Sequence, residues 1–427
     1  MPEEIITSVQ SGDLVLFCGA GISTEGKTVL PYSFYSSIQE ELDMDNPALP
    51  FSELMQLYCD QANGRKKLLQ AIRKRFQYIH SFPELERQAT AFHRELSEIY
   101  QIRTIITTNW DTYFEKCCGA IPITIPQDFA FWDDSSRYVI KIHGSINNLG
   151  SIIATKDDYQ HCYESLQNGI IGATIKSILS TKTVVFIGFS FGDEDFARII
   201  DYLRKELGEI YPHIYIVTLD ETLSDRINYD RSTVLLTSGT FFLHRLKNEL
   251  IGRGLIVNCS AQNKIPSVLD ILRDVHAETS EIDLTEYPSA IFTLAYQDGI
   301  IHSFERYLQN RNTGEYNKPG YVAHIVKNYD VLAKLQHINQ NYWTEAYYIG
   351  YSNGLVLIGA CDDIFDETIR AFPLFYLPNV KNKIDSIETL IHEIEKTSSP
   401  RSKYYRFAKK LVEERGGKDI IMHHPPL

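Results

Sequence analysis

The sequence predicts an α/β protein in which helices cover both faces of a parallel sheet. Short, almost continuously apolar runs recur along the first 280 residues, and segments with helical spacing separate them. Such strands are typical of parallel sheets, because both faces of these sheets are buried. A length of 427 residues suits two or three domains, so we expect this sheet to form the larger one.

The expected strands end at glycine or polar residues, and helical segments connect them. They are Asp13–Cys18, Arg103–Thr107, Tyr138–Ile142, Val184–Ile187, His213–Val217 and Leu255–Asn258. A helical insertion is predicted from about residue 32 to residue 100, with helices at Tyr32–Leu42, Phe51–Gln61, Arg65–Gln77 and Arg87–Tyr100. A later helix ends near Leu207, and one at Ile265–Val275 closes the domain near residue 280.

Residues 281–427 are expected to form a smaller mixed α/β domain that serves assembly or regulation. Two apolar runs within residues 341–360 flank Ser352-Asn353-Gly354, which is typical of a β-hairpin turn. Helices are expected at Asp385–Lys396 and Lys403–Glu414. This part of the sequence carries no motif to which chemistry can be attached.

Charge and cysteine content narrow the function classes. The net charge of −13 repels phosphate backbones, so we expect nucleic acid to be contacted only indirectly or through a partner. The sequence has no apolar run of 18 residues, which disfavours a membrane span, and its acidic N-terminus lacks a secretory pattern. The seven cysteines form no CxxC pair, which disfavours a disulfide framework or a structural zinc site. We therefore expect a cytoplasmic protein.

One basic run stands out against this acidic background. It consists of Arg65, Lys66, Lys67, Arg73, Lys74 and Arg75, on the opposite face of the predicted helix from Leu68 and Ile72. A solvated helix face and a contact for a partner or a nucleic acid both explain this pattern.

The motif FCGAGIS follows the first expected strand. Glycines there allow a sharp turn and a close approach to a pyrophosphate, so the N–H groups of Gly19, Ala20 and Gly21 could bind phosphate oxygens. Ser23 could add a hydroxyl. A structural turn remains an alternative, because the dehydrogenase spacing GxGxxG is absent.

Two motifs follow the next long strands. In TTNWD, Thr108, Asn109 and Asp111 lie at a strand end, where ligands bind in open α/β sheets, although Asp111 could equally cap a helix. In KIHGS, His143 could act as a base at cellular pH, although a lone histidine is often structural.

A fourth motif, GFSFGDEDF, opens a helix. Gly188 and Ser190 could hold an anion or a ribose at the positive end of that helix. Asp193 disfavours an anion there, so a helix cap is the alternative.

The order GAGIS, TTNWD, KIHGS, GFSFGD resembles the NAD-binding Rossmann-like core of the sirtuin family. The flanking segments AFHRELSEIY and IIATKDDYQHCY are similar to those of prokaryotic sirtuin-like proteins of antiphage defence, and the resemblance covers about residues 8–280. It implies a phosphate-binding turn, a nicotinamide-ribose site, a nicotinamide contact, a catalytic histidine and an adenosine side. These roles fall, in that order, on Gly19, Ala20, Gly21 and Ser23; on Asn109; on Asp111; on His143; and on Gly188 and Ser190, and Thr108 is a further expected cofactor contact.

Two departures from the sirtuin pattern change the reaction that the resemblance implies. The interval Ser145–Val184 holds only Cys162, where sirtuin deacetylases carry a zinc ribbon, and the arginine-bearing segment after GAGIS is missing. We therefore expect hydrolysis of NAD to nicotinamide and ADP-ribose, with NAD as substrate and no zinc. The alternatives are a protein deacylase or ADP-ribosyltransferase, and a non-enzymatic module that senses NAD.

The resemblance also implies a setting for this activity. It suggests antiphage defence by NAD depletion, an abortive infection response, with control through a homo-oligomer. A separate HerA-family ATPase is the expected partner. A fused cyclic-nucleotide sensor and an Argonaute-associated subunit remain alternatives.

Overall fold

The structure is a computed structural model, and the chain divides into two compact units. It describes residues 1–26, 29–44, 49–133, 135–189, 198, 201, 205, 208, 212–223, 231–257, 260–360, 372–415 and 423. The first unit comprises Met1–Leu255 with Asn312–Gly314, and the second comprises Ile256–Arg311 with Glu315–Leu427. The division therefore lies before the boundary expected near residue 280.

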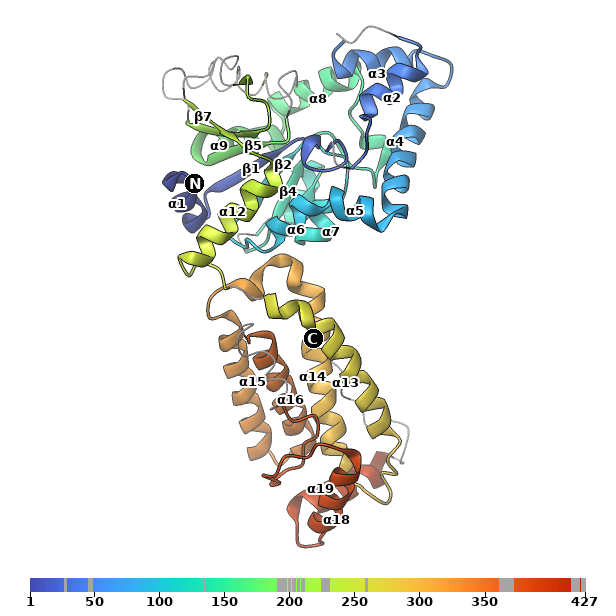
Figure 1. Ribbon diagram of the computed structural model, residues 1–427, viewed down its shortest axis with the longest axis vertical. Helices are drawn as coiled ribbons and strands as arrows, with labels where there is room; N and C mark the ends of the chain where they lie inside the picture. The colour runs from blue at the N-terminus through green and yellow to red at the C-terminus, as the bar shows by residue number, and fades with distance from the viewer. Residues whose placement is uncertain are drawn as a thin grey trace. The chain divides into compact units, whose positions relative to one another are not determined.

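A parallel sheet forms the centre of the first unit (Figure 1). Its strands are β1 (Leu14–Cys18), β2 (Thr104–Thr107), β3 (Ile121–Ile123), β4 (Tyr138–Lys141), β5 (Thr183–Ile187), β6 (Ile214–Thr218) and β7 (Ser232–Leu236). Their order is β3-β4-β2-β1-β5-β6-β7, and every pairing is parallel. The predicted fold class is confirmed for this unit, and the short edge strands β3 and β7 are additions to the expected set.

The strand order creates a switch point beside β1. The chain leaves β1 for β2 on one side, and it later returns to β5 on the other side. In open α/β sheets, ligands bind outside the carboxyl ends of the strands at such a point. The site is therefore expected at the carboxyl ends of β1 and its neighbours.

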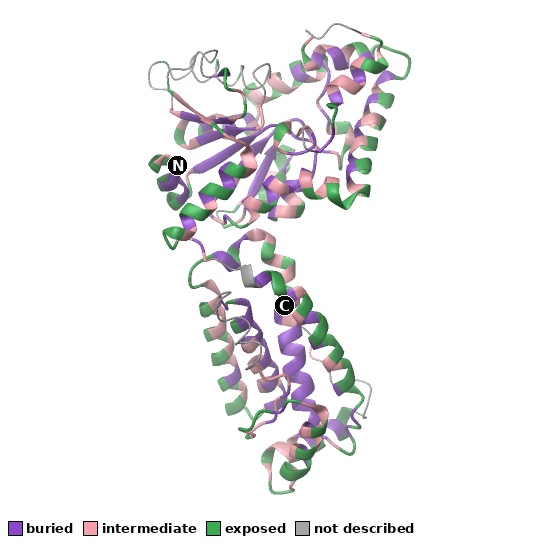
Figure 2. Ribbon diagram, in the orientation of Figure 1, coloured by how far each residue is buried: buried purple, intermediate pink, exposed green. Residues whose placement is uncertain are grey.

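Helices cover both faces of the sheet. Val15 and Phe17 of β1 share a core with Ile175 and Leu179 of α9 (Ile170–Thr181). The helices α1 (Glu3–Ser11), α6 (Ala91–Ser97), α7 (Tyr113–Cys118) and α12 (Gly239–Gly252) form a second group, in which α1 contacts β1 and α12 contacts β6. Figure 2 shows that the central strands are buried between these layers.

The predicted helical insertion packs beside the carboxyl edge of the sheet. Its helices are α2 (Phe34–Glu41), α3 (Phe51–Cys59), α4 (Gly64–Ser81) and α5 (Pro83–Ala89), followed by α6. The apolar side chains of α2, α3 and α4 share one core with Ile152, Ala154 and Trp110, which belong to the loops after β4 and β2. This core holds the insertion against the segments that carry the TTNWD and KIHGS motifs.

Arg137 is buried in the first unit and stabilises the segments around it through hydrogen bonds to their carbonyls. Its side chain donates to the carbonyls of Ile99 (2.7 Å), Ile102 (2.9 Å) and Cys118 (2.9 Å). Replacing Arg137 with Met is expected to lower the free energy of unfolding by about 3 kcal/mol or more, because buried carbonyls lose their donors. Urea unfolding monitored by circular dichroism measures this loss. Arg137→Lys should lose less, and a Met variant as stable as the wild type would contradict the prediction.

His93 makes the stability of this unit depend on pH. Burial lowers its pKa to about 4, and its ring packs against Tyr113 and Phe114. An unfolded histidine titrates near pH 6.5, so below that pH the unfolded chain takes up a proton that the folded protein does not. The free energy of unfolding should therefore fall as the pH drops from about 6.5 to about 4. In urea titrations across this range, His93→Phe should show a smaller fall, and an unchanged fall would contradict this role.

The described part of the second unit consists of helices, so the expected β-hairpin is wrong. The main ones are α13 (Ile265–Ser280), α14 (Ala290–Asn310), α15 (Tyr321–Ile338), α16 (Tyr342–Ile358), α18 (Ile387–Thr397) and α19 (Lys403–Arg415). Helix α16 occupies the segment assigned to the hairpin, and no strand occurs among the described residues after 280. The mixed α/β composition expected for residues 281–427 is corrected accordingly, while α18 and α19 match predicted helices.

Close packing between α14 and α16 explains this error. A Cβ atom on Gly350 would lie 1.9 Å from the carbonyl oxygen of Tyr296, and one on Gly354 would lie 2.0 Å from Oγ of Ser303. The glycines interpreted as turn residues therefore allow two helices to approach each other. The less buried side of α16 also carries apolar residues, among them Tyr348, Ile349 and Val356, so its sequence shows little helical periodicity to distinguish it from strands.

Two further expected elements are a strand at Leu255–Asn258 and a helix that ends near Leu207. The expected strand Leu255–Asn258 is wrong in its described part, because residues 255–257 form no strand. Asn258 and most of the helix expected to end near Leu207 lie outside the described residues. Within the described chain, no helix combines the length and apolar character that a membrane crossing requires.

Candidate active site

The four motifs follow strands that end level with one another. Cys18 at the end of β1 pairs with Thr107 of β2 and with Ile187 of β5, and Thr107 in turn pairs with Lys141 of β4. Each motif contains or directly follows the last residue of its strand, so the register places the first three motifs and the start of the fourth at one edge of the sheet. This arrangement confirms the shared edge that the sequence predicted.

The glycines after β1 and β5 pack directly against each other. The N–H of Gly19 donates to the carbonyl of Ile187 at 2.8 Å, and that of Gly21 donates to the carbonyl of Gly188 at 3.0 Å. A Cβ on Gly19 would lie 2.7 Å from the Gly188 oxygen, and Gly188 has a φ of +82°. These two amides are thus engaged within the protein, which differs from the expectation that they face a phosphate. Ala20 and Ser23 lie on the same turn, in and after the short 3₁₀ helix Ala20–Ile22.

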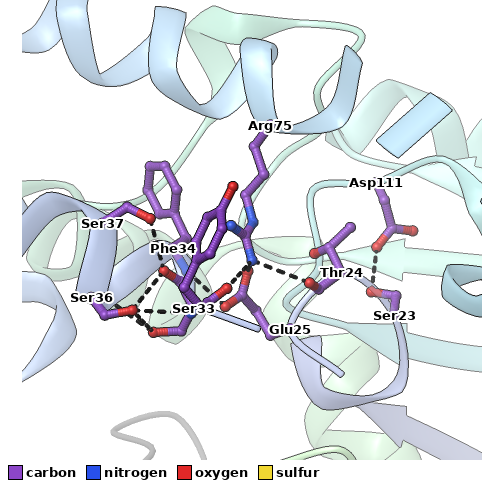
Figure 3. A network of polar contacts seen from close by, with 10 residues as sticks. Ser23, Thr24, Glu25, Ser33, Phe34, Ser36, Ser37, Arg75 and Asp111 are labelled. Carbon is purple, nitrogen blue, oxygen red and sulfur yellow. Dashed lines mark hydrogen bonds and ion pairs between the residues drawn. The ribbon is translucent and has the colours of Figure 1, made fainter. Parts of the chain in front are cut away.

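Ser23, Asn109 and Asp111 form a buried chain of hydrogen bonds. The Ser23 hydroxyl donates to Oδ2 of Asp111 at 2.9 Å and accepts from Nδ2 of Asn109 at 3.3 Å. All three side chains are at most 4% exposed. Figure 3 shows the contact between Ser23 and Asp111. Side-chain hydrogen bonds therefore join the GAGIS motif to the TTNWD motif.

Of the two interpretations of Asp111, the structure shows the contact at the start of a helix. While Oδ2 accepts from Ser23, Oδ1 accepts from the backbone N–H of Tyr113 at 3.1 Å, at the start of α7. Asp111 thus fixes the start of α7, and its contact with a nicotinamide amide stays a prediction. Asn109 offers an unused hydrogen-bond acceptor, because its buried Oδ1 has no hydrogen-bond partner among the described residues. A buried acceptor of this kind can receive a hydroxyl or a water from a ligand.

Two threonines at the end of β2 form hydrogen bonds that connect this strand to β1. The Thr107 hydroxyl donates to the carbonyl of Cys18 at 2.9 Å and accepts from the N–H of Asn109 at 3.0 Å. The N–H of Thr108 donates to the same Cys18 carbonyl at 3.2 Å. The proposed cofactor contact Thr108 is therefore held at the junction of β1 and β2.

Lys141 is a buried residue of this site that the sequence reasoning missed. Its ammonium donates to the backbone carbonyl of Asp111 and lies 3.1 Å from Oε1 of Glu115. Burial raises the pKa of Glu115, and the Lys141 charge opposes that shift. Lys141 thereby connects β4 to the turn that carries Asp111. A charged residue within the apolar run YVIKI was the available signal.

His143 lies two residues beyond β4, in a buried position. It is 3% exposed, and its ring centroid lies 4.8 Å from that of Tyr159 in α8 (Lys156–Asn168). Its carbonyl accepts from the N–H of Ile153 at 3.1 Å. The neighbouring loop also bonds to the TTNWD motif, because the N–H of Ile146 donates to the Trp110 carbonyl at 2.8 Å. His143 is thus placed at the same edge as Asn109 and Asp111.

The remaining expectations about ligands concern Ser190 and zinc. Ser190 lies outside the described residues, so its predicted role on the adenosine side stays a prediction. In the described portion of the chain, no three His, Cys, Asp or Glu side chains gather as a metal site would require.

The family comparison concerns the region that carries these motifs. Residues 103–239 match the SIR2-like domain. This region begins at β2 and includes Asn109, Asp111, His143 and Gly188, whereas the GAGIS turn precedes it.

Curated relatives match about half of this chain. The NAD(+) hydrolase ThsA of Cytobacillus dafuensis is 30% identical over 213 residues, which cover 48% of this chain and 41% of that protein. The NAD(+) hydrolase ThsA of Enterococcus faecium is 28% identical over 218 residues, covering 49% and 44%. Defense-associated sirtuin 2 of Bacillus subtilis is 26% identical over 211 residues, covering 48% and 20%. The chain therefore spans less than half the length of these relatives.

A solved structure concerned with the mechanism and regulation of Sir2 enzymes also matches. It has 15% sequence identity and a TM-score of 0.32, and the match covers 58% of this chain and 98% of that one. A TM-score this low supports no argument, so the fold class rests on the sheet described above.

Proposed function

We propose that this protein hydrolyses NAD⁺ to nicotinamide and ADP-ribose. The observation that carries the proposal is the buried Ser23–Asn109–Asp111 chain at a sheet edge shared with His143 and Gly188. The SIR2-like region supports it, as do relatives that bear the name NAD(+) hydrolase. NAD is the substrate in this proposal, and no metal takes part.

The proposed reaction breaks the bond between ribose C1′ and the nicotinamide nitrogen. The electron pair leaves with nicotinamide, and an oxocarbenium-like state develops on the ribose, as in glycoside hydrolysis. Asn109 positions the attacking water or a ribose hydroxyl through its unpaired Oδ1. Asp111 accepts a hydrogen bond from the leaving carboxamide. Water forms the new bond to C1′, and His143 takes its proton directly or through a ribose hydroxyl.

The remaining residues bind rather than react. Ala20 and Ser23 contact the pyrophosphate from the turn after β1, while Gly19 and Gly21 allow that turn to approach β5 closely. Thr108 contributes to cofactor binding, and the roles proposed for Gly188 and Ser190 are contacts with the adenosine. Lys141 is a positioning residue, because it acts through the Asp111 backbone.

We also propose a biological role for this activity. The enzyme acts in the cytoplasm in antiphage defence, where depletion of NAD leads to abortive infection. It works as a homo-oligomer under the control of a HerA-family ATPase. The name defense-associated sirtuin 2, borne by one relative, supports the defence setting.

The test is a product assay on the purified protein, alone and with a HerA-type ATPase encoded beside it. Chromatography should show loss of NAD⁺ with equal amounts of nicotinamide and free ADP-ribose. ADP-ribose attached to protein, or deacylation of an acyl-lysine peptide, would favour the transferase or deacylase instead. Binding of NAD without turnover in either condition would favour a sensing module and refute the hydrolase.

A further inference from the structure

A cavity separate from the candidate active site lies within the helical insertion. It has a volume of about 450 Å³ and lies among α2, α3, α4 and the segment before α2. None of the candidate active-site residues lines it. Small-molecule sites commonly have volumes of about 300–1,000 Å³, so the cavity has the size of a ligand pocket.

One wall of the cavity carries two cations in a row along α4. Lys67, Ala71, Lys74 and Tyr78 all line it, and their helical spacing places them on one face. Lys67 and Lys74 are two turns apart, about 10.5 Å along the helix axis. Both are exposed, and neither forms an ion pair with any residue that the structure describes. The acidic residue on the opposite side, Glu41, accepts a 2.6 Å hydrogen bond from the Tyr58 hydroxyl.

The cavity also offers aromatic surface. Tyr32 and Tyr78 line the cavity and are 51% and 50% exposed, and Phe34 lies buried beside them. Large exposed rings beside cations are the combination that binds a planar base and a phosphate together, by stacking and by charge-assisted hydrogen bonds.

Arg75 forms the third cationic element and is built into the wall. Its guanidinium lies 2.9 Å from Oε1 of Glu25 and 5.5 Å from the ring centroid of Tyr32, and it donates to the carbonyl of Tyr32 at 3.0 Å. The side chain is only 9% exposed, yet its Nε has no hydrogen-bond partner among the described residues. A buried donor without a partner is costly unless something else satisfies it.

The same arginine connects the cavity to the candidate active site. It also donates to the carbonyl of Thr24 at 3.3 Å, and Thr24 follows Ser23, which bonds to Asp111 (Figure 3). Glu25, its ion-pair partner, accepts from the N–H of Phe34 at 2.9 Å. One side chain thus holds both the pocket wall and the residues that follow the GAGIS turn.

We propose that this cavity binds a ribonucleoside monophosphate, separately from the NAD site. Lys67 and Lys74 bind the phosphate, and the base stacks on Tyr32 and Tyr78. This assignment gives a specific role to part of the basic run, for which a solvated face and a partner contact both remained open.

The test is calorimetric titration of the full chain with AMP, GMP, CMP and UMP, with adenosine and inorganic phosphate alongside. At least one monophosphate should bind about tenfold more tightly than both fragments. Lys67→Gln/Lys74→Gln should weaken that binding at least about tenfold. Lys66→Gln/Arg73→Gln is the matched control, because it removes two charges at the same spacing from residues that do not line the cavity. It should change the affinity less than about twofold.

Each other outcome overturns the proposal. Binding of none of the four monophosphates, or equal weakening in both double variants, would remove the site. Phosphate binding as tightly as the monophosphates would reduce it to an anion site. Loss of the binding in Asn109→Ala would place the nucleotide in the candidate active site instead. These readouts need no turnover, so they stand whether or not NAD hydrolysis is confirmed.

A link between the two sites follows and rests on the proposed hydrolase activity. A nucleotide on Tyr32 should stabilise the Arg75 contacts to Thr24 and Tyr32, and thereby the position of Ser23. The bound monophosphate should therefore lower the KM for NAD⁺ at least about twofold in the wild type but not in Lys67→Gln/Lys74→Gln. An unchanged or increased KM in the wild type would refute this link.

Discussion

Replacing His143 with alanine is expected to lower the rate of NAD⁺ consumption about 10²–10⁴-fold, the usual contribution of a general base. The imidazole lies two residues after β4, level with the ends of β1 and β2, where Asn109 and Asp111 follow. Its removal leaves the attack of water on C1′ without a group that takes the water's proton. The measurement is release of nicotinamide in initial-rate assays of the activated protein.

His213→Ala is the matched control for this change. His213 bonds to the Thr233 hydroxyl at 2.8 Å, next to β6 and β7, and belongs to none of the four motifs. That variant should keep the wild-type rate. Because His143 is buried against Tyr159, circular dichroism must show that the His143 variant remains folded. A folded His143→Ala protein with the full rate would exclude His143 as the base.

Replacing Gly188 with alanine is expected to lower the free energy of unfolding of the first unit by about 2–4 kcal/mol. Part of the loss is backbone strain, because a φ of +82° is unfavourable for a residue with a Cβ. The rest is overlap, since the new methyl would lie 2.7 Å from the Gly19 carbonyl oxygen and 2.8 Å from Cγ2 of Ile22. The turn after β1 would have to shift, so NAD⁺ turnover should fall as well.

Gly12→Ala separates these two causes. Gly12 has a similar φ of +74°, but no atom lies within 4 Å of the position its Cβ would occupy. It should therefore show the backbone cost alone, about 1–2 kcal/mol in urea unfolding, with wild-type turnover. Equal losses in the two variants would show that the close approach of the β1 and β5 turns contributes nothing.

The strands and the motif positions were predictable because they depend on local pattern. Four apolar runs of β1, β2, β4 and β5 end in glycine or polar residues, and parallel strands of this kind share a carboxyl edge. The edge strand β3 was missed, because Ile121–Ile123 is too short to show periodicity and contains a proline. Three helices of the insertion, α2, α3 and α4, were predicted, since their apolar residues repeat with helical spacing, whereas the expected helix Arg87–Tyr100 is divided at Thr90 between α5 and α6.

The contacts within the site could not be read from the same pattern. Ser23 and Asp111 are 88 residues apart, and their hydrogen bond depends on how β1 and β2 pair. The same holds for the ammonium of Lys141, which reaches the Asp111 backbone only because β4 lies beside β2. The direction of the Gly19 and Gly21 amides likewise depends on β5, a strand far along the chain.

The sequence by itself determined the parallel sheet, the helical insertion and the order of the four motifs, because apolar runs, helical spacing and turn residues act over a few positions. Only the tertiary structure decided that Asn353-Gly354 lies within a helix, since close packing of α14 against α16 overrides the turn preference of these residues. It also decided which polar groups meet. Hydrogen bonds such as Ser23–Asp111 require two strand ends to be level, and that register is a property of the assembled sheet.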